Sequence, residues 1–357
     1  MKRRSLLSLL LYGAAGTTLA GRGLAQGPTQ GLTHSLARTP AGAEFDPVLL
    51  LLELRGGNDG LNTLAPIDDP IYRKARPTLA LPRGLPLEQG LALHPALEPL
   101  LPLWQQRRLG FALGVGWAVP TRSHFKAMDQ WARANPEGEG PGWLAKAFET
   151  RGQAGALVAL GPSGCSAMEG GSRLSLQMGP AQLHSDAPAT IDAARAGSNP
   201  MLRRLLELES ASQSELAQLR TRLAPLPAGL AIPRGELGPQ VAMALRLIGS
   251  GVCPPVLQLA QGGYDTHANQ GARHSRQLRN LAEALACLDA GLQKLRPRPQ
   301  VSLLAVSEFG RRLRQNGSGG TDHGSASIAL LYGDAPPHPF LGRYPRLDEL
   351  DERGDLI

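Results

Sequence analysis

Five short apolar runs recur along the chain, each next to glycine or polar residues. They are VLLLLEL at Val48–Leu54, LGFALGV at Leu109–Val115, VLQLA at Val256–Ala260, VSLLAV at Val301–Val306 and IALLY at Ile328–Tyr332. Short runs that are apolar at nearly every position are typical of strands buried on both faces, as in parallel sheets covered by helices. The pattern therefore predicts five strands of a buried sheet.

Helical spacing appears between these runs. The plainest case is a series of leucines three and four residues apart, at 278, 281, 285, 288, 292 and 295, which is the pattern of an amphipathic helix. Further helices are expected over Pro95–Gln106, around Met128 and Trp131, from Asn199 to about Leu223, and over Gly238–Ile248.

Strands that alternate with helices predict an α/β fold, with a mainly parallel sheet covered by helices on both faces. We expect residues 26–47 to be a linker and residues 48–357 to form a single α/β domain with a helical insertion near 199–248.

The first 25 residues are typical of an export signal. Arg3 and Arg4 precede an apolar run, and Gly23-Leu24-Ala25 offers a cleavage site after Ala25. The arginine pair indicates the twin-arginine export machinery as a partner. The apolar run is too short for a stable membrane span. The sequence therefore predicts a periplasmic or secreted protein.

Composition excludes some functions. Removal of residues 1–25 takes away four cations and no acid, so the formal net charge falls from +7 to +3. This modest charge and an aromatic content of 4% do not indicate a nucleic-acid partner. The three cysteines, Cys165, Cys253 and Cys287, have spacings unlike a zinc ribbon, and we expect them to be buried as small apolar side chains.

Metal-binding side chains stand next to the predicted strands. Carboxylates and imidazoles that converge from separate elements can bind a divalent metal ion, and those found here are Asp59, Asp265, His267, Glu308, Asp322 and His323. Each one alone has a simpler interpretation, because an Asp in a glycine turn is usually an Asx turn and a single loop His is usually structural.

Two further residues are candidates for chemistry. Ser123 could be a nucleophile, although a serine before a helix is normally its N-cap. Arg311, in the cluster RRLR, could bind an anionic ester, although an exposed helix face would also explain it. The chain has no G-x-S-x-G elbow, no P-loop and no G-x-G-x-x-G dinucleotide motif.

Several motifs carry a resemblance to a known family. The segments LRGGNDGLN, LHP, TRSHF, GGYDTHANQ, SEFGRRLRQNGSGGTDHG and GDL occur in this order from Val48 to the end of the sequence. They resemble the exported bacterial family called domain of unknown function 1501, which is similar to the alkaline phosphatase and sulfatase superfamily. Members normally continue for a short segment beyond the position of Ile357, which suggests a shortened or incomplete chain.

The resemblance implies roles for these residues. Asp59 resembles the first-strand metal ligand, Ser123 stands near the nucleophile position, and His323 resembles the final histidine ligand. Asp265 and His267 look like the Asp/His pair of one metal site. Glu308 stands where that superfamily has an Asp-His pair, with Phe309 in place of the histidine.

Together these features predict a zinc ion, or a similar ion, bound by Asp265, His267 and His323. A second ion, near Asp59 and Glu308, would be weak or would be a harder cation such as magnesium. No C-x-P-x-R motif supports formylglycine chemistry.

The expected function is an exported metal-dependent hydrolase of phosphate or sulfate esters. Its substrate would be a small anionic ester or an ester linked to a polysaccharide, and the nucleophile would be a metal-activated serine or water. The alternative is a non-enzymatic binding or assembly protein of the cell envelope that kept the fold with a degenerate metal site.

Overall fold

The computed structural model of the protein describes residues 47–117, 119–151, 157–162, 165–170, 175–177, 197–203, 205–207, 209–210, 221–251, 254–334 and 338–356. The expected signal segment, nearly all of the linker and Cys253 lie outside these residues. The expected helix from Asn199 to Leu223 lies partly outside them, and residues 200–203, 205–207, 209–210 and 221–222 are helical.

An eight-stranded sheet forms the centre of the molecule, with the order β13-β5-β12-β9-β1-β8-β6-β7. Its strands are β1 (Val48–Leu54), β5 (Leu109–Val115), β6 (Leu157–Ala159), β7 (Ser175–Gln177), β8 (Val256–Gln261), β9 (Val301–Val306), β12 (Ser327–Tyr332) and β13 (Phe340–Gly342). The five predicted strands all belong to this sheet.

One strand, β12, runs against the others. It pairs antiparallel with both β5 and β9, whereas the remaining pairs in the sheet are parallel. The carboxyl ends of β1, β5, β8 and β9 therefore lie at one edge, and residues just before β12 lie at that same edge. This arrangement brings His323, which precedes a strand, to the polar residues that follow the other strands.

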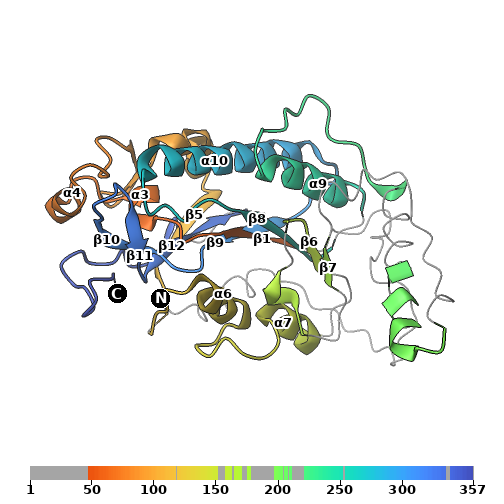
Figure 1. The fold of residues 1–357 in the computed structure, drawn as a ribbon. Helices are drawn as coiled ribbons and strands as arrows, with labels where there is room; N and C mark the ends of the chain where they lie inside the picture. The colour runs from red at the N-terminus through yellow and green to blue at the C-terminus, as the bar shows by residue number, and fades with distance from the viewer. Residues whose placement is uncertain are drawn as a thin grey trace.

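Helices cover both faces of the sheet, as Figure 1 shows. One face carries α9 (Leu237–Gly249) and α10 (Gln270–Lys294), and the opposite face carries α6 (His124–Arg133) and α7 (Trp143–Arg151). The predicted α/β fold with a mainly parallel sheet covered on both faces is thus confirmed. No helix in the described part of the chain has the length and apolar character needed to cross a membrane.

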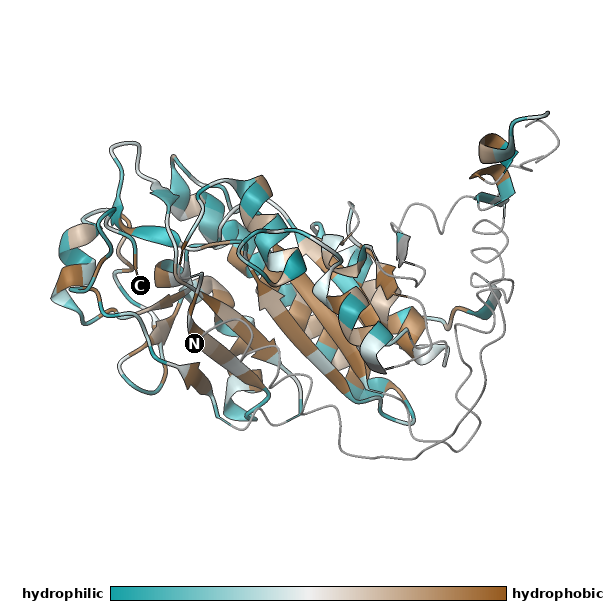
Figure 2. Ribbon diagram, turned by 90° about the horizontal axis from the view of Figure 1, so that it is seen from below, coloured by the Kyte–Doolittle hydropathy of each residue, from teal (hydrophilic) through white to brown (hydrophobic). Residues whose placement is uncertain are grey.

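Apolar side chains point to both faces of the sheet, which explains why a layer of helices covers each face. In β1, Val48, Leu50, Leu52 and Leu54 pack into the core under α9 and α10, while Leu51 packs into the core under α6 and α7. Successive strand side chains point to opposite faces. Figure 2, which views the molecule from below, shows the central strands coloured as hydrophobic.

The expected helix over Pro95–Gln106 is divided. A 3-10 helix, η1 (Pro95–Leu100), leads into α5 (Leu101–Gln105). Pro99 and Pro102 lack the N–H that an α-helical hydrogen bond requires, so a single regular helix is not favoured across them.

Smaller elements surround the strand-exit edge. These are α3 (Gly60–Thr63), β2 (Leu64–Ala65), α4 (Pro70–Ala75), β3 (Leu85–Pro86), β4 (Ala92–Leu93), η2 (Ser166–Met168), β10 (Arg311–Gln315) and β11 (Thr321–His323). β10 and β11 form an antiparallel pair in which Arg311 lies opposite His323.

Candidate metal centre

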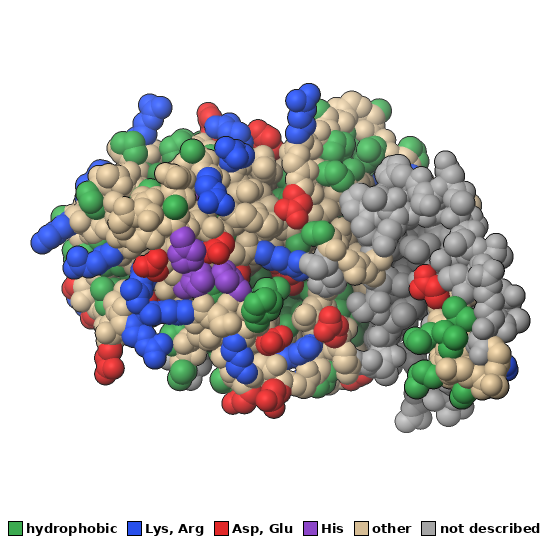
Figure 3. All heavy atoms as spheres, in the orientation of Figure 1, with side chains coloured by type: hydrophobic (Ala, Val, Ile, Leu, Met, Phe, Trp, Pro, Cys, Tyr) green, Lys and Arg blue, Asp and Glu red, His purple; other side chains and the backbone are tan. Residues whose placement is uncertain are grey.

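Three side chains from distant parts of the chain meet at the strand-exit edge. The ligand atoms of His124, Asp265 and His323 all lie within 4.8 Å of one another. They come from the start of α6, the loop after β8 and the end of β11. Histidine side chains gather on the surface of this part of the molecule, with carboxylates beside them (Figure 3).

His124 is positioned by the beginning of α6. Ser123 is the N-cap of this helix, and its hydroxyl accepts a hydrogen bond from the backbone N–H of Lys126. His124 follows directly, and its Nδ1 lies 2.8 Å from Glu308 Oε1. Its Nε2 is buried and makes no hydrogen bond within the described part of the chain, with Asp265 Oδ2 at 3.5 Å. The imidazole therefore aims an unsatisfied nitrogen at Asp265.

Glu308 fixes the orientation of the His124 ring. Burial opposes ionisation of this carboxyl, but the hydrogen bonds from His124 and from the backbone N–H of Gly56 lower the pKa of Glu308. An ionised carboxylate only accepts hydrogen bonds, so Nδ1 of His124 carries the proton. The same contact raises the pKa of His124, opposed by partial burial.

His323 is held in the same way by the backbone. Its Nδ1 lies 2.7 Å from the carbonyl oxygen of Arg122, which can only accept, so Nδ1 is the protonated nitrogen. Its Nε2 lies 3.2 Å from Asp265 Oδ1. Burial lowers the pKa of His323 and favours the neutral ring.

His267 brings a third imidazole to the centre. Its Nδ1 lies 3.4 Å from Asp322 Oδ1, and its Nε2 lies 3.1 Å from Asp265 Oδ1 and 2.9 Å from Nε2 of His323. In all three histidines an oxygen therefore lies at Nδ1, and Nε2 is turned toward Asp265.

Several distances suit a small divalent cation. Four ligands about 2.0 Å from a tetrahedral ion are about 3.3 Å apart, and four of the contacts here run from 2.9 to 3.5 Å, while the ligand atoms of His124, Asp265 and His323 as a group lie within 4.8 Å of one another. A positive ion would also separate the two neighbouring Nε2 lone pairs and satisfy the buried Nε2 of His124. Histidines with Nδ1 bound to an outer oxygen are the usual form of metal-ligating imidazoles.

Arg311 donates a hydrogen bond to Asp265 and so fixes its carboxylate. This buried guanidinium donates to Asp265 Oδ1 at 2.7 Å and also to the carbonyl oxygens of Gly56, Gly57, Tyr264 and Thr321. Burial raises the pKa of Asp265, but Arg311 and the nearby histidines bring it to about 2. As placed, Arg311 orients the carboxylate and the strand-exit loops, and does not reach out to hold an ester.

Asp59 lies in a separate buried network. Its Oδ2 is 2.5 Å from Nη1 of Arg76 and also accepts from Gln270. Arg76 outweighs the effect of burial and lowers the pKa of Asp59. The structure thus brings together Asp265, His267 and His323 of the expected ligands, places Glu308 behind His124, and directs Asp59 to an arginine.

His124 is the candidate metal ligand that sequence reasoning missed. The motif TRSHF pointed to Ser123, whose exposed hydroxyl caps the helix. The resemblance implies a histidine at position 309, where this chain has Phe309. In the structure a histidine from α6 contacts Glu308, and the ring centroids of His124 and Phe309 are 4.9 Å apart. The available signal was a histidine following an N-cap serine at the exit of a buried strand.

The chain belongs to the family described as protein of unknown function (DUF1501), whose model matches residues 114–335. This confirms the family that the sequence motifs resembled. No curated protein matches the chain.

Solved structures show a distant likeness. The zinc complex of the C-terminal periplasmic domain of EcEptC from Escherichia coli is 11% identical, with a TM-score of 0.39 over 83% of this chain and 74% of that one. An alkaline phosphatase from the Antarctic bacterium TAB5 is 9% identical, with a TM-score of 0.36 over 83% and 93% of the two chains. These scores are too low to carry a statement about activity.

Proposed function

We propose that the protein is an exported, metal-dependent hydrolase of phosphate or sulfate esters. The observation that carries the proposal is the convergence of three Nε2 atoms on the carboxylate of Asp265, with the buried Nε2 of His124 unsatisfied within the described chain. His124, His267, His323 and Asp265 would hold the ion, and zinc suits this set of nitrogen and oxygen ligands. A bound divalent ion supplies Lewis acidity and lowers the pKa of water at neutral pH.

Two arginines beside the centre share one buried carboxylate. Arg122 Nη2 lies 2.7 Å from Asp355 Oδ2, and Arg312 Nε lies 3.3 Å from Asp355 Oδ1. Asp355 is fully buried, whereas both arginine side chains are about 30% exposed. One carboxylate neutralises only one of the two guanidinium charges, but the half-exposed carboxylates of Asp265 and Asp322 lie at the same centre, so a bound divalent ion would supply the charge that attracts an ester anion.

Glu308 and Asp322 have a positioning role in this proposal. They bind the Nδ1 side of His124 and His267 and so direct the other nitrogen of each ring inward.

The proposal that the protein is exported rests on the twin arginines of the N-terminal segment. The proposed nucleophile is water, which a bound divalent ion would activate, and Ser123 has the role of N-cap of α6.

The experiment combines metal analysis with ester hydrolysis. We expect the purified protein to bind about one zinc ion and to hydrolyse p-nitrophenyl phosphate or p-nitrophenyl sulfate. His323→Ala should lower both zinc occupancy and activity. Ser123→Ala should keep both within about threefold, whereas a complete loss of activity with normal zinc content would make Ser123 the nucleophile.

A second candidate function is a binding or assembly protein in which the ion is structural. It is favoured by the partners of the two remaining carboxylates, since Asp59 faces Arg76 and Glu308 faces His124. Within the described residues, one group of three or more candidate ligands meets the distance requirement. Stoichiometric zinc binding without hydrolysis of either ester would support this candidate.

A further inference from the structure

A groove lies beside the first half of α10, on the face of the sheet opposite α6. One wall is formed by the turns of α10 that carry Gly271 and Ser275, and the other walls by the start of η1 and by residues 78–83, which follow α4. Its cavity volume is about 360 Å³, which is within the range of small-molecule sites. None of the four candidate metal ligands lines this groove.

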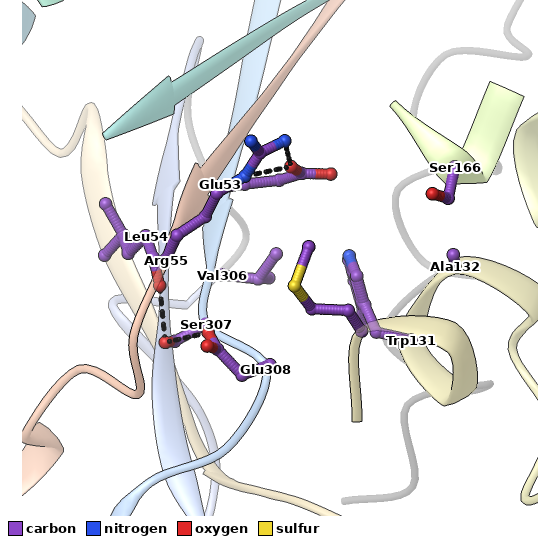
Figure 4. Close-up of a pocket in the computed structure, with 10 residues that line it drawn as sticks. Glu53, Leu54, Arg55, Trp131, Ala132, Ser166, Val306, Ser307 and Glu308 are labelled. Carbon is purple, nitrogen blue, oxygen red and sulfur yellow. Dashed lines mark hydrogen bonds and ion pairs between the residues drawn. The ribbon is translucent and has the colours of Figure 1, made fainter. Parts of the chain in front are cut away.

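The pocket between the sheet and α6 is much smaller. In Figure 4 the hydrogen-bonded Glu53 and Arg55 lie at one end of that pocket and Ser307 and Glu308 at the other. Its cavity volume is about 30 Å³, which leaves room for water but not for a ligand. The groove beside α10 is therefore the better candidate for a binding site.

Two arginines bring positive charge to the groove. Arg83, from the segment before β3, and Arg279, from α10, both line it and are exposed. Neither guanidinium forms a hydrogen bond or an ion pair with another residue that the structure describes. No aspartate or glutamate is among the described residues that line the groove. Its walls therefore carry two cations and no counterion.

Ser275 adds a hydroxyl donor to the same groove. The backbone N–H of Ala96 donates to Nδ1 of His94 at 3.0 Å, so this nitrogen carries no proton. Burial lowers the pKa of His94 to about 4, so at pH 7 the ring is neutral and its proton is on Nε2. Nε2 then donates to the hydroxyl oxygen of Ser275 at 3.2 Å. This is the one hydrogen bond of that hydroxyl within the described part of the chain, so its own proton is left to donate to a ligand.

Apolar side chains complete the walls. Leu79, Leu81, Pro95 and Ala96 are among the residues that line the groove. An apolar group that enters would exchange water for apolar contact, which favours binding. Guanidinium groups match the oxygen atoms of carboxylates and phosphates, which they bind bidentately. The groove thus combines donors for an oxyanion with a surface for an apolar group.

We propose that this groove binds a small organic anion, which is a carboxylate or a phosphate ester with an apolar body. The guanidinium groups of Arg83 and Arg279 and the hydroxyl of Ser275 bind the anionic group, and the apolar walls contact the rest of the ligand. The inference goes beyond the proposed function and is independent of it, because it requires neither a bound metal ion nor hydrolysis.

Calorimetry with three small probes tests the groove. It is carried out on the full chain and on His323→Ala, in which binding at the metal centre is weakened. In both proteins we expect phenylphosphonate and benzoate to bind at least about tenfold more tightly than benzyl alcohol, a neutral molecule of similar size, because hydrogen bonds to charged groups are the stronger ones. The tighter anion identifies the preferred head group. Equal affinity for all three probes would overturn the inference, and so would failure of both anions to bind.

Charge variants locate the anion in this groove. Arg83→Gln and Arg279→Gln should each weaken binding of the tighter anion by about tenfold. Arg276→Gln removes an exposed arginine of α10 that does not line the groove. This matched control should retain the affinity within about twofold. Full affinity in both groove variants would contradict the inference.

A steric variant tests the same groove without a change of charge. A Cβ atom at Gly271 would have no other atom within 4 Å, so Gly271→Leu adds a side chain at the wall of the groove without a clash. It should weaken binding of the anion by about tenfold or more. Ala290→Leu, at an exposed position of the same helix, is the control and should bind normally. Normal binding in Gly271→Leu would place the ligand elsewhere.

The outcomes separate this inference from the proposed function. Binding that is lost in Arg279→Gln but kept in His323→Ala, in a protein that hydrolyses neither ester, would support the groove and contradict the hydrolase. Binding that is lost in His323→Ala but kept in both arginine variants would place the anion at the metal centre. That result would contradict the groove and support the hydrolase.

Discussion

At the scale of single residues, the candidate metal centre is defined by what binds Nδ1, the outer nitrogen of each histidine. Glu308, Asp322 and the carbonyl of Arg122 lie at the three Nδ1 atoms. Each contact fixes a ring orientation before any ion arrives. Such outer partners commonly change metal affinity by about 10- to 100-fold when mutated.

Glu308→Gln tests this role. The amide keeps the size of the side chain but loses the charge, so it holds the Nδ1 proton of His124 less strongly. We expect zinc affinity to fall by about tenfold, measured by competition with a chelator. Glu349→Gln, which changes an exposed glutamate, is the control. Unchanged affinity in Glu308→Gln would show that His124 is oriented without Glu308.

At the scale of elements, the C-terminal segment completes the centre. Asp355 binds Arg122, whose own carbonyl oxygen accepts from His323, and it also binds Arg312 next to Arg311. The backbone of Leu356 accepts a hydrogen bond from Ala326, just before β12. A segment more than 200 residues away in sequence thus supports the loop that carries His124.

Asp355→Asn should destabilise the loop that carries Arg122 and His124. Replacing the buried carboxylate weakens the contacts to both arginines, at a cost of about 1–3 kcal/mol in the free energy of unfolding. Zinc affinity should fall as well, because the carbonyl of Arg122 is no longer held in place. Chemical denaturation and chelator competition measure the two effects. Asp348→Asn, at an exposed ion pair with Arg346, should change neither.

The elements were predicted more completely than the site. The apolar runs predicted β1, β5 and β9 with the bounds that the structure has, because burial on both faces leaves an unbroken apolar pattern. The direction of β12 was not predictable, since a short apolar run carries no sign of its orientation. The sequence did not single out His124, because its partners Glu308 and Asp265 are more than 140 residues away in the chain and only the fold brings them together.

At the scale of the whole molecule, two buried histidines link stability to pH. Burial lowers the pKa of His94 and of His274 to about 4. Both are neutral in the folded protein at pH 5, whereas in the unfolded chain they bind protons below about pH 6.5. Their contribution to stability is therefore complete above pH 6.5 and is lost as the pH falls toward 4.

We expect the free energy of unfolding to decrease by about 2 kcal/mol for each of these imidazoles between pH 7 and pH 5. Urea denaturation with a chelator present measures this without a contribution from bound metal. His274→Gln should reduce the dependence by about half. His338→Gln, at an exposed position, should leave it unchanged, and an equal slope in His274→Gln would contradict the assignment.

Export is a second property of the whole molecule. Replacement of both Arg3 and Arg4 by lysine should keep the precursor in the cytoplasm if the twin-arginine machinery exports it. Cell fractionation followed by N-terminal sequencing measures both the location and cleavage after Ala25. Normal export of the double variant would contradict the route, and an unprocessed exported chain would contradict the cleavage site.

The origin of the ligands in three distant segments has a thermodynamic consequence. An ion bound by His124, Asp265 and His323 cross-links positions about 140 and 60 residues apart, so its binding free energy adds to the folding free energy. At a free zinc concentration about 100 times the dissociation constant, the gain is about 2.7 kcal/mol. The melting temperature of the protein would then rise with the free zinc concentration of its compartment. Removal of zinc would lower the free energy of unfolding.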